Sequence, residues 1–159
     1  MRVAVITVST SRAAQGGPDE SGDRLEQFAR GLGGELAARE IVSDERQLIE
    51  RRLRHFSESD VCALVLTTGG TGVAPRDQTP EATRAVIERE VPGIGEAMRA
   101  ASRAHTKHWL LSRGVAGIRG TTLIINFPGS PRSIAQAGAA IADALPHALA
   151  LIAGTASEH

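Results

Sequence analysis

Apolar residues along the chain fall into two patterns, continuous runs and helically spaced positions. The continuous runs, rich in β-branched residues, predict buried strands at residues 2–10, 36–42, 61–66, 115–118 and 121–127. Between these runs, apolar residues recur every three or four positions, which is typical of amphipathic helices. The alternation predicts a three-layer α/β/α fold with a mostly parallel sheet. Only Arg119-Gly120 separates the last two strands, which predicts an antiparallel hairpin at one edge.

Start signals place the helices between the strands. The helices are expected to begin at Ser21, at Asp44 in a capping box with Gln47, at Thr79, after Pro92-Gly93 and at Ser130. We expect the third helix to cover residues 79–90 and the last one residues 130–145, where Pro146 either kinks the chain or starts another helix. Residues 11–20 are expected to form a loop.

Composition limits the classes of partner. The 159 residues predict one domain, 1–159, and lysine plus arginine balance aspartate plus glutamate at 18 each. Zero net charge and 3% aromatic residues argue against a nucleic acid or an anionic membrane as partner. The apolar run at residues 1–10 is too short for a signal peptide or a membrane span, so we expect a cytoplasmic protein. Cys62, the only cysteine, excludes an intrachain disulfide and is expected in the core.

A glycine-rich loop follows the expected strand at residues 61–66. Three glycines let backbone N–H groups approach a ligand without a Cβ in the way: Gly69, Gly70 and Gly72. Thr79 and Pro80 suit the start of a helix whose free N–H groups would face the same loop. These features predict an anion site. Asp77 lies within it, where a carboxylate repels a phosphate unless it holds a metal ion or handles a proton.

Two common phosphate-binding loops are excluded by the residues present. A P-loop needs a lysine after its last glycine, and the only lysine of the chain is Lys107. The dinucleotide fingerprint Gly-x-Gly-x-x-Gly needs a third glycine three residues after the second. Gly70-Thr71-Gly72 is followed by Pro75 at that position. The other interpretation of this segment is a tight strand-to-helix turn that binds nothing.

The same order of residues recurs near the carboxyl end. The strand at 121–127 is followed by the turn Pro128-Gly129, and Ser130-Pro131 opens a helix. Ligands of open α/β sheets bind at the carboxyl ends of the strands, so two such units predict two anion subsites along one edge. Ser9 and Ser11 end the first strand and are expected to face the same edge.

The segment 67–83 (T-T-G-G-T-G-V-A-P-R-D-Q-T-P-E-A-T) resembles the signature of the MogA/MoaB-type molybdenum cofactor proteins and of the G domain of gephyrin. The similarity continues at 41–45 (I-V-S-D-E), 111–113 (L-S-R), 116–120 (A-G-I-R-G), 123–130 (L-I-I-N-F-P-G-S) and 144–148 (A-L-P-H-A). It covers essentially the whole chain in order. The resemblance implies an enzyme that adenylylates molybdopterin with Mg²⁺ and ATP and assembles as a homotrimer or hexamer.

The resemblance also implies roles for individual residues. Asp77 and Asp44 would act in catalysis, and Asp77 would hold Mg²⁺. The phosphates of ATP and molybdopterin would be bound by Thr68, Gly69, Gly70, Thr71, Gly72, Gly129, Ser130, Ser9, Ser11 and Arg113. Thr10 stands where the family often has Asp or Asn, a departure that concerns the first loop.

Other functions stay open at this point. A non-catalytic pterin-binding or scaffold protein of the MoaB type would have the same loops. Metal-insertion and competence-damage-related proteins carry a similar Gly-Gly-x-Gly…Asp loop, although the metal-insertion proteins are much longer. His105 and His108 are close in sequence, but a zinc site needs three or four ligands and no cysteine or third histidine is near.

Overall fold

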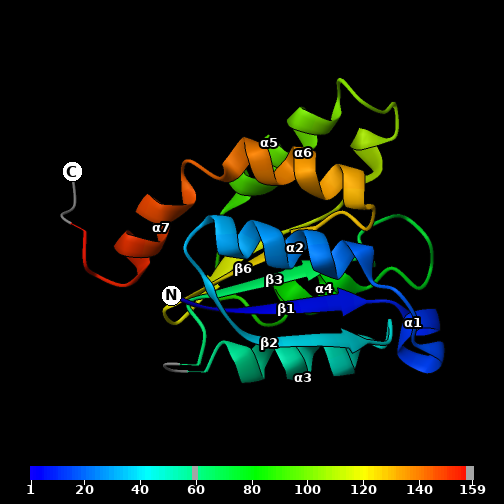
Figure 1. Ribbon diagram of the computed structural model, residues 1–159, viewed down its shortest axis with the longest axis horizontal. Coiled ribbons are helices and arrows are strands. Elements are labelled where there is room, and N and C mark those ends of the chain that lie inside the picture. Colours follow the sequence, from blue (N-terminus) through cyan, green and yellow to red (C-terminus); the bar gives the residue numbers. More distant parts are fainter. Residues whose placement is uncertain (59–60, 157–159) are drawn as a thin grey trace.

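The computed structural model describes residues 1–58 and 61–156, in which a six-stranded sheet has helices on both faces (Figure 1). The strands are β1 (Arg2–Val8), β2 (Glu35–Val42), β3 (Leu64–Thr68), β4 (Arg89–Glu90), β5 (Ala116–Arg119) and β6 (Thr122–Phe127). Their order is β2-β1-β3-β6-β5-β4. The first four in that order are parallel, and β5 runs antiparallel to both β6 and β4. The mostly parallel sheet with an antiparallel edge hairpin is confirmed.

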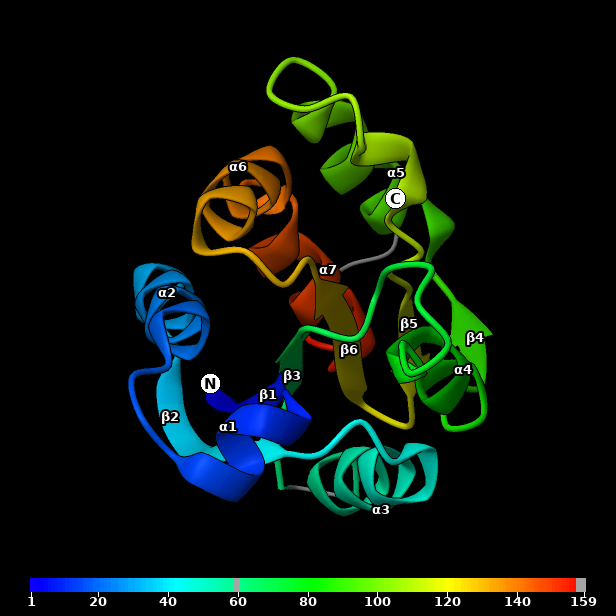
Figure 2. The ribbon, with the colours of Figure 1, turned by 90° about the vertical axis from the view of Figure 1, so that its right-hand side faces the viewer.

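The helices form the outer two layers. They are α1 (Thr10–Gln15), α2 (Glu20–Gly31), α3 (Arg46–Phe56), α4 (Thr79–Arg84), α5 (Pro92–Ser102), α6 (Pro131–Ile141) and α7 (Leu145–Ile152), with a 3₁₀ turn η1 at Trp109–Leu111. Figure 2 looks along the strands and shows α2, α5, α6 and α7 on one side of the sheet and α3 and α4 on the other. Pro146 lies in the first turn of α7, so it starts a second helix after α6.

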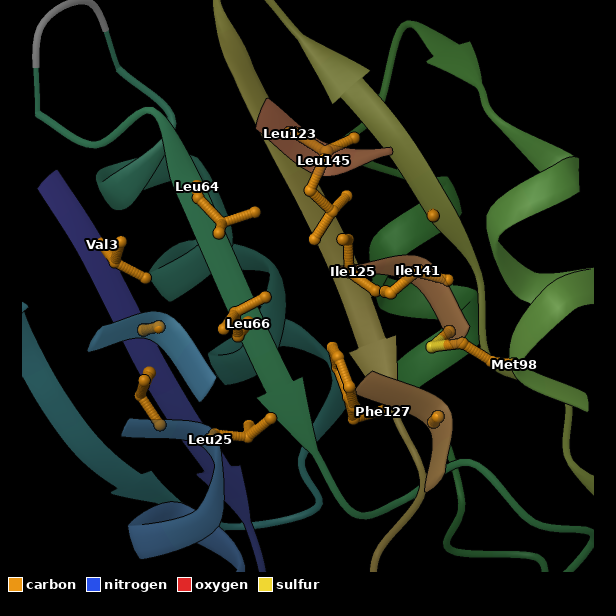
Figure 3. Close-up of a cluster of buried hydrophobic side chains, with 14 of the residues drawn as sticks. Val3, Leu25, Leu64, Leu66, Met98, Leu123, Ile125, Phe127, Ile141 and Leu145 are labelled. Carbon is orange, nitrogen blue, oxygen red and sulfur yellow. The ribbon is translucent and has the colours of Figure 1, made fainter. Parts of the chain in front are cut away.

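Side chains alternate along the central strands β1, β3 and β6 and fill two separate cores. Val3 and Val5 of β1 pack with Leu25 of α2 and Phe127 of β6 in the core beneath α2, α5 and α6 (Figure 3). Ala4 and its alternate neighbours in β1 pack against α3 and α4 instead. This alternation follows from the period of two along a strand. Burial on both faces explains why these strands read as continuous apolar runs.

One helix is shorter than expected, and an edge strand takes its place. The helix predicted for 79–90 ends at Arg84, and Arg89–Glu90 pairs with β5 as strand β4. The N–H of Glu88 donates to the carbonyl of Ile118 at 2.8 Å, and that of Val91 donates to the carbonyl of Ala116 at 2.8 Å. These tertiary hydrogen bonds use backbone groups that a continued helix would have kept for itself.

The first three helices also start differently from expectation. Helix α1 is formed by Thr10, expected at the end of the first strand, and by residues 11–15, expected in a loop; Ser9 caps it by accepting a hydrogen bond from the N–H of Arg12. Asp19 rather than Ser21 caps α2. The capping box at Asp44 is wrong, because α3 begins after Glu45 and no side chain caps it. Ser21 and Asp44 bind residues of other loops, as described below.

No single helix in the described part of the chain is long and apolar enough to cross a membrane. Helices α6 and α7 together reach the required length and composition, but the chain bends by 68° between them. The apolar face of α6, with Ile134, Ala137 and Ile141, lies in the core between this helix and the sheet.

Candidate active site

The candidate site lies where the parallel strands β1, β3 and β6 end, at the edge that faces the viewer in Figure 2. The loop after β3 carries the glycines, the loop after β6 carries Pro128-Gly129, and the chain after β1 carries Ser9 and Ser11. The two β-strand partners Thr68 and Phe127 lie opposite each other in register, so both loops leave the sheet at the same level.

Gly69 and Gly70 are required by the backbone at the start of the glycine loop. Their φ angles are 92° and 65°, in the region that favours glycine. A Cβ on Gly69 would collide with the carbonyl oxygen of Val8, and one on Gly70 would collide with Oγ1 of Thr79. The loop can therefore lie against the end of β1 only because both positions lack a side chain.

Thr79 holds the first half of the loop. Its hydroxyl donates to the carbonyl of Gly69 at 2.9 Å, and its backbone N–H donates to the carbonyl of Gly70 at 3.1 Å. Thr79 is fully buried, in the first position of α4. The pattern Thr79-Pro80 predicts Thr79 as the N-cap of α4, which is wrong, because the N-cap is Gln78 and the Thr79 hydroxyl donates to the loop.

Arg113 holds the second half of the loop from a distant segment. Its backbone N–H donates to the carbonyl of Thr71 at 2.9 Å, and its Nε donates to the carbonyl of Gly72 at 2.7 Å. Its Nη2 donates to the carbonyl of Asp77 at 2.9 Å. The guanidinium also forms an ion pair with Glu81 of α4. The hydrogen bond from Arg113 holds the pKa of the Glu81 carboxyl below its ordinary value.

The N–H groups of the glycine loop have no hydrogen-bond partner in the described part of the protein. Within residues 1–58 and 61–156, no hydrogen bond uses the backbone N–H groups of Gly69, Gly70, Thr71 and Gly72. Unpaired backbone N–H groups in succession form a concave site of positive partial charge that suits a phosphate. Helix α4 has only six residues, so the anion site is attributed to the N–H groups of the loop and not to the start of the helix.

Asp77 closes the turn that follows the glycines. Its Oδ2 accepts a hydrogen bond from the N–H of Ala74 at 3.0 Å, and its own N–H donates to the carbonyl of Ala74 at 2.9 Å. The other carboxylate oxygen, Oδ1, has no hydrogen-bond partner among the described residues. Asp77 thus both shapes the turn and keeps one oxygen for a ligand.

Asp44 reaches the same place from the end of β2. Its Oδ2 accepts hydrogen bonds from the N–H and the hydroxyl of Thr10, at 3.0 and 2.7 Å. Oδ1 lies toward Gly70, 3.4 Å from where a Cβ of that glycine would sit. Both aspartates line one small polar cavity of about 130 Å³, together with Ser9, Thr10, Ser11, Gly70 and Arg76.

The second loop is held by two hydroxyl groups. Oγ1 of Thr68 donates to the carbonyl of Pro128 at 2.7 Å, and Oγ of Ser21 donates to the carbonyl of Gly129 at 2.7 Å. Ser130 caps α6 by accepting the N–H of Ser133 at 3.2 Å. A Cβ on Gly129 would lie 3.6 Å from Cα of Gly69, so the two loops meet.

A second cavity lies beside these loops, between α5 and α6. It measures about 210 Å³ and is lined partly by Met98, Trp109, Ser112, Asn126, Pro128 and Ser133. No local pattern indicates this cavity, since the segment 105–114 has no strand or helix periodicity. The residues that line it come from elements far apart along the chain, which only the fold brings together.

Most of the predicted site residues gather at one edge. Asp44, Asp77, Ser9, Ser11 and Gly70 share the small cavity. Gly69 touches the second loop at Gly129, and Thr68 joins the loops by its hydroxyl. Arg113 lies at the glycine loop, but its guanidinium is bound to loop carbonyls and to Glu81. Sequence reasoning missed the supporting roles of Ser21 and Thr79, whose hydroxyls donate to carbonyls 108 and 10 residues away.

The described residues contain no cluster of three or more His, Cys, Asp or Glu side chains that could hold a metal ion by themselves. The two aspartates of the small cavity nevertheless fit Mg²⁺, because this ion is usually bound by one or two carboxylates together with substrate phosphates and water. Each aspartate has one oxygen with no hydrogen-bond partner among the described residues.

Residues 4–147 match the family model described as "Probable molybdopterin binding domain". The chain belongs to this molybdopterin-binding family. It is 50% identical over 115 residues to the molybdopterin adenylyltransferase of Helicobacter pylori J99, a match that covers 72% of this chain and 65% of that protein.

Two further members of the family match over more of the chain. The molybdopterin adenylyltransferase of Escherichia coli K12 is 41% identical over 148 residues, which is 91% of this chain and 75% of that protein. The molybdopterin biosynthesis enzyme MoaB from Thermus thermophilus is 44% identical in sequence to this chain. Its crystal structure superposes on this one with a TM-score of 0.89, over 96% of each chain. The predicted family and fold are thereby confirmed.

Proposed function

We propose that this chain is a molybdopterin adenylyltransferase of molybdenum cofactor biosynthesis. The observation that carries the proposal is the meeting of two loops at one sheet edge, next to two aspartates. One of these loops has four backbone N–H groups that no other described residue binds. A substrate pair with several phosphates suits that arrangement. The names of the Helicobacter and Escherichia relatives supply the reaction.

The reaction is a direct phosphoryl-type displacement. A terminal phosphate oxygen of molybdopterin attacks the α-phosphorus of ATP, the bond from that phosphorus to the β-phosphate oxygen breaks, and pyrophosphate leaves. The small cavity is lined by hydroxyls, carboxylates and an arginine, with no histidine or cysteine among its described residues, so a covalent enzyme intermediate is not expected. Catalysis comes from positioning and from stabilising charge on the phosphates.

Each group of the site has a part in this scheme. The N–H groups of Gly69 to Gly72 bind one phosphate, and those of Gly129 and Ser130 bind another. Asp77 and Asp44 would hold Mg²⁺, which neutralises phosphate charge when bound. Ser9 and Ser11 supply hydroxyls to the same cavity. The second cavity, with Met98 and Trp109 in its wall, is suited to a planar ring of either substrate.

The test is release of pyrophosphate from Mg-ATP by the purified chain, measured with molybdopterin present and absent. We expect release only when both substrates are present, and formation of adenylylated molybdopterin in equal amount. Binding of molybdopterin without any release of pyrophosphate would instead identify a non-catalytic pterin-binding protein. The trimer or hexamer implied by the family resemblance stays a prediction, which the mass of the protein in solution tests.

A further inference from the structure

Arg113 makes an unusual set of contacts for an arginine at a phosphate site. Its side chain binds two backbone carbonyls of the glycine loop, those of Gly72 and Asp77, and its own N–H binds a third, that of Thr71. Nη1 and Nη2 contact the two carboxylate oxygens of Glu81. Four of the five N–H donors of a guanidinium are thereby used within the protein, and the charge is neutralised by Glu81.

The direction of a carbonyl determines the direction of the neighbouring N–H. In a trans peptide the C=O and N–H bonds point to opposite sides. Binding of the Thr71 carbonyl by Arg113 therefore turns the N–H of Gly72 away from Arg113. Binding of the Gly72 carbonyl turns the N–H of Val73 in the same manner.

Thr79 acts in the same way on the preceding peptides. By binding the carbonyls of Gly69 and Gly70, it turns the N–H groups of Gly70 and Thr71 away from α4. All four consecutive carbonyls of the loop are therefore held by two residues, Thr79 and Arg113. Both contact α4, since Thr79 is its first residue and Arg113 is paired with Glu81 in its first turn.

We propose that Arg113 is a positioning residue that acts through the peptide groups of the glycine loop, and that Glu81 keeps it in place. Arg113 then does not contact the phosphate, in contrast to the anion contact that the family resemblance implies. Its partly buried ion pair with Glu81 holds the guanidinium on the loop carbonyls. This inference rests on the proposed role of the loop as a phosphate cradle.

Two variants separate positioning from direct contact. Arg113→Lys keeps the positive charge but removes the planar fork that reaches several carbonyls at once. Glu81→Gln keeps Arg113 but removes the charge that anchors it. If Arg113 contacted the anion directly, Arg113→Lys would retain most of the binding and Glu81→Gln would leave binding unchanged or tighten it, because the guanidinium would be released. If Arg113 positions the loop, both variants weaken binding.

The experiment is a titration of the ¹⁵N-labelled full chain with inorganic pyrophosphate, followed through the backbone amide resonances of Gly70 to Val73. We expect those amides to shift in the wild type and the dissociation constant to rise about tenfold in Arg113→Lys, as for loss of one hydrogen bond to a charged group. In Glu81→Gln the dissociation constant is also expected to rise, by a smaller factor. Arg54→Lys is the matched control, since Arg54 also binds a glutamate and a backbone carbonyl but lies on α3.

The outcomes distinguish this inference from the proposed function. Wild-type affinity in both Arg113→Lys and Glu81→Gln, with dispersed spectra that show folded protein, would overturn the positioning role. Amides of Gly70 to Val73 that do not respond to pyrophosphate in the wild type would overturn it as well. Amides that respond as expected in a protein without adenylyl transfer would leave the inference standing and reject the proposed activity.

Discussion

Asp44 and Thr10 bind each other through three hydrogen bonds across two loops. Thr10 donates both its N–H and its hydroxyl to Oδ2 of Asp44, and the N–H of Asp44 donates back to the hydroxyl at 3.0 Å. The arrangement fixes one carboxylate oxygen and leaves the other facing the small cavity beside Gly70. Thr10 thus orients a carboxylate for which the sequence pattern indicated a helix cap.

The pair allows the charge of Asp44 to be separated from its orientation. Asp44→Asn retains an oxygen that can accept from Thr10 but loses the charge, so we expect a folded protein with adenylyl transfer reduced by about 100-fold or more. Thr10→Val keeps the charge and removes the hydroxyl, and a smaller loss is expected. Turnover of both variants is measured beside their melting temperatures. Full activity in Asp44→Asn would remove the carboxylate charge from the mechanism.

Asp77→Asn is expected to fold normally and to lose turnover. The amide oxygen can still accept the N–H of Ala74, so the turn is kept. Loss of the charge at a preorganised site is expected to lower kcat by about 100- to 1000-fold, or about 3–4 kcal/mol of transition-state stabilisation. Steady-state rates of pyrophosphate release with molybdopterin measure this. A variant with wild-type kcat would show that Asp77 only shapes the loop.

Gly70→Ala is expected to abolish nucleotide binding. The residue has a φ of 65°, and an added Cβ would collide with the Thr79 hydroxyl that holds the loop. Gly120→Ala is the matched control, because Gly120 has a φ of 54° and open space around its Cβ position. Both variants carry the strain of a left-handed residue, about 1–2 kcal/mol. Calorimetry with ATP should show lost binding only in Gly70→Ala, and equal affinity in the two would reduce the loop to a simple turn.

Acid stability should depend on Asp19. Burial raises the pKa of its carboxyl, but hydrogen bonds from the Gly22 N–H, the Thr7 hydroxyl and Arg39 together outweigh burial and hold the pKa below its ordinary value. A lowered folded pKa contributes stability that is present above the ordinary carboxyl pKa and is lost as the pH falls through the folded pKa.

The wild type is therefore expected to lose unfolding free energy below the ordinary carboxyl range, and Asp19→Asn is expected to be less stable at neutral pH with a flatter acid dependence. Urea unfolding from neutral to acid pH measures both slopes. Parallel slopes in the two proteins would mean that Asp19 contributes nothing to acid sensitivity.

Strands β1, β2, β3, β5 and β6 and the two loops could be predicted because their signals are local. A continuous run such as that around Val65 is buried on both faces, and Ser130 caps α6 by accepting a hydrogen bond from the N–H of Ser133, three residues away. The capping box at Asp44 looked equally local. It failed because Thr10, 34 residues away, competes for the same carboxylate.

The contacts of Arg113 could not be predicted for a similar reason. The partners of its side chain lie 32 to 41 residues away, on a loop and on helix α4, which ends earlier than the sequence predicts. The resemblance matched Arg113 to an arginine of the family and therefore implied an anion contact. Only the pairing of α4 with the segment after η1 shows that the guanidinium is directed at backbone carbonyls.

Trp109 lies in the 3₁₀ turn that leads into Arg113, in the wall of the cavity beside the second loop. The guanidinium of Arg103 stands 5.8 Å from the centre of its ring. Trp109 is the only tryptophan of the chain, which contains no tyrosine, so nearly all near-ultraviolet fluorescence originates from this one ring. The protein therefore carries an intrinsic optical reporter at its candidate site, and stopped-flow emission can follow the arrival of a ring in the cavity in real time without any attached dye.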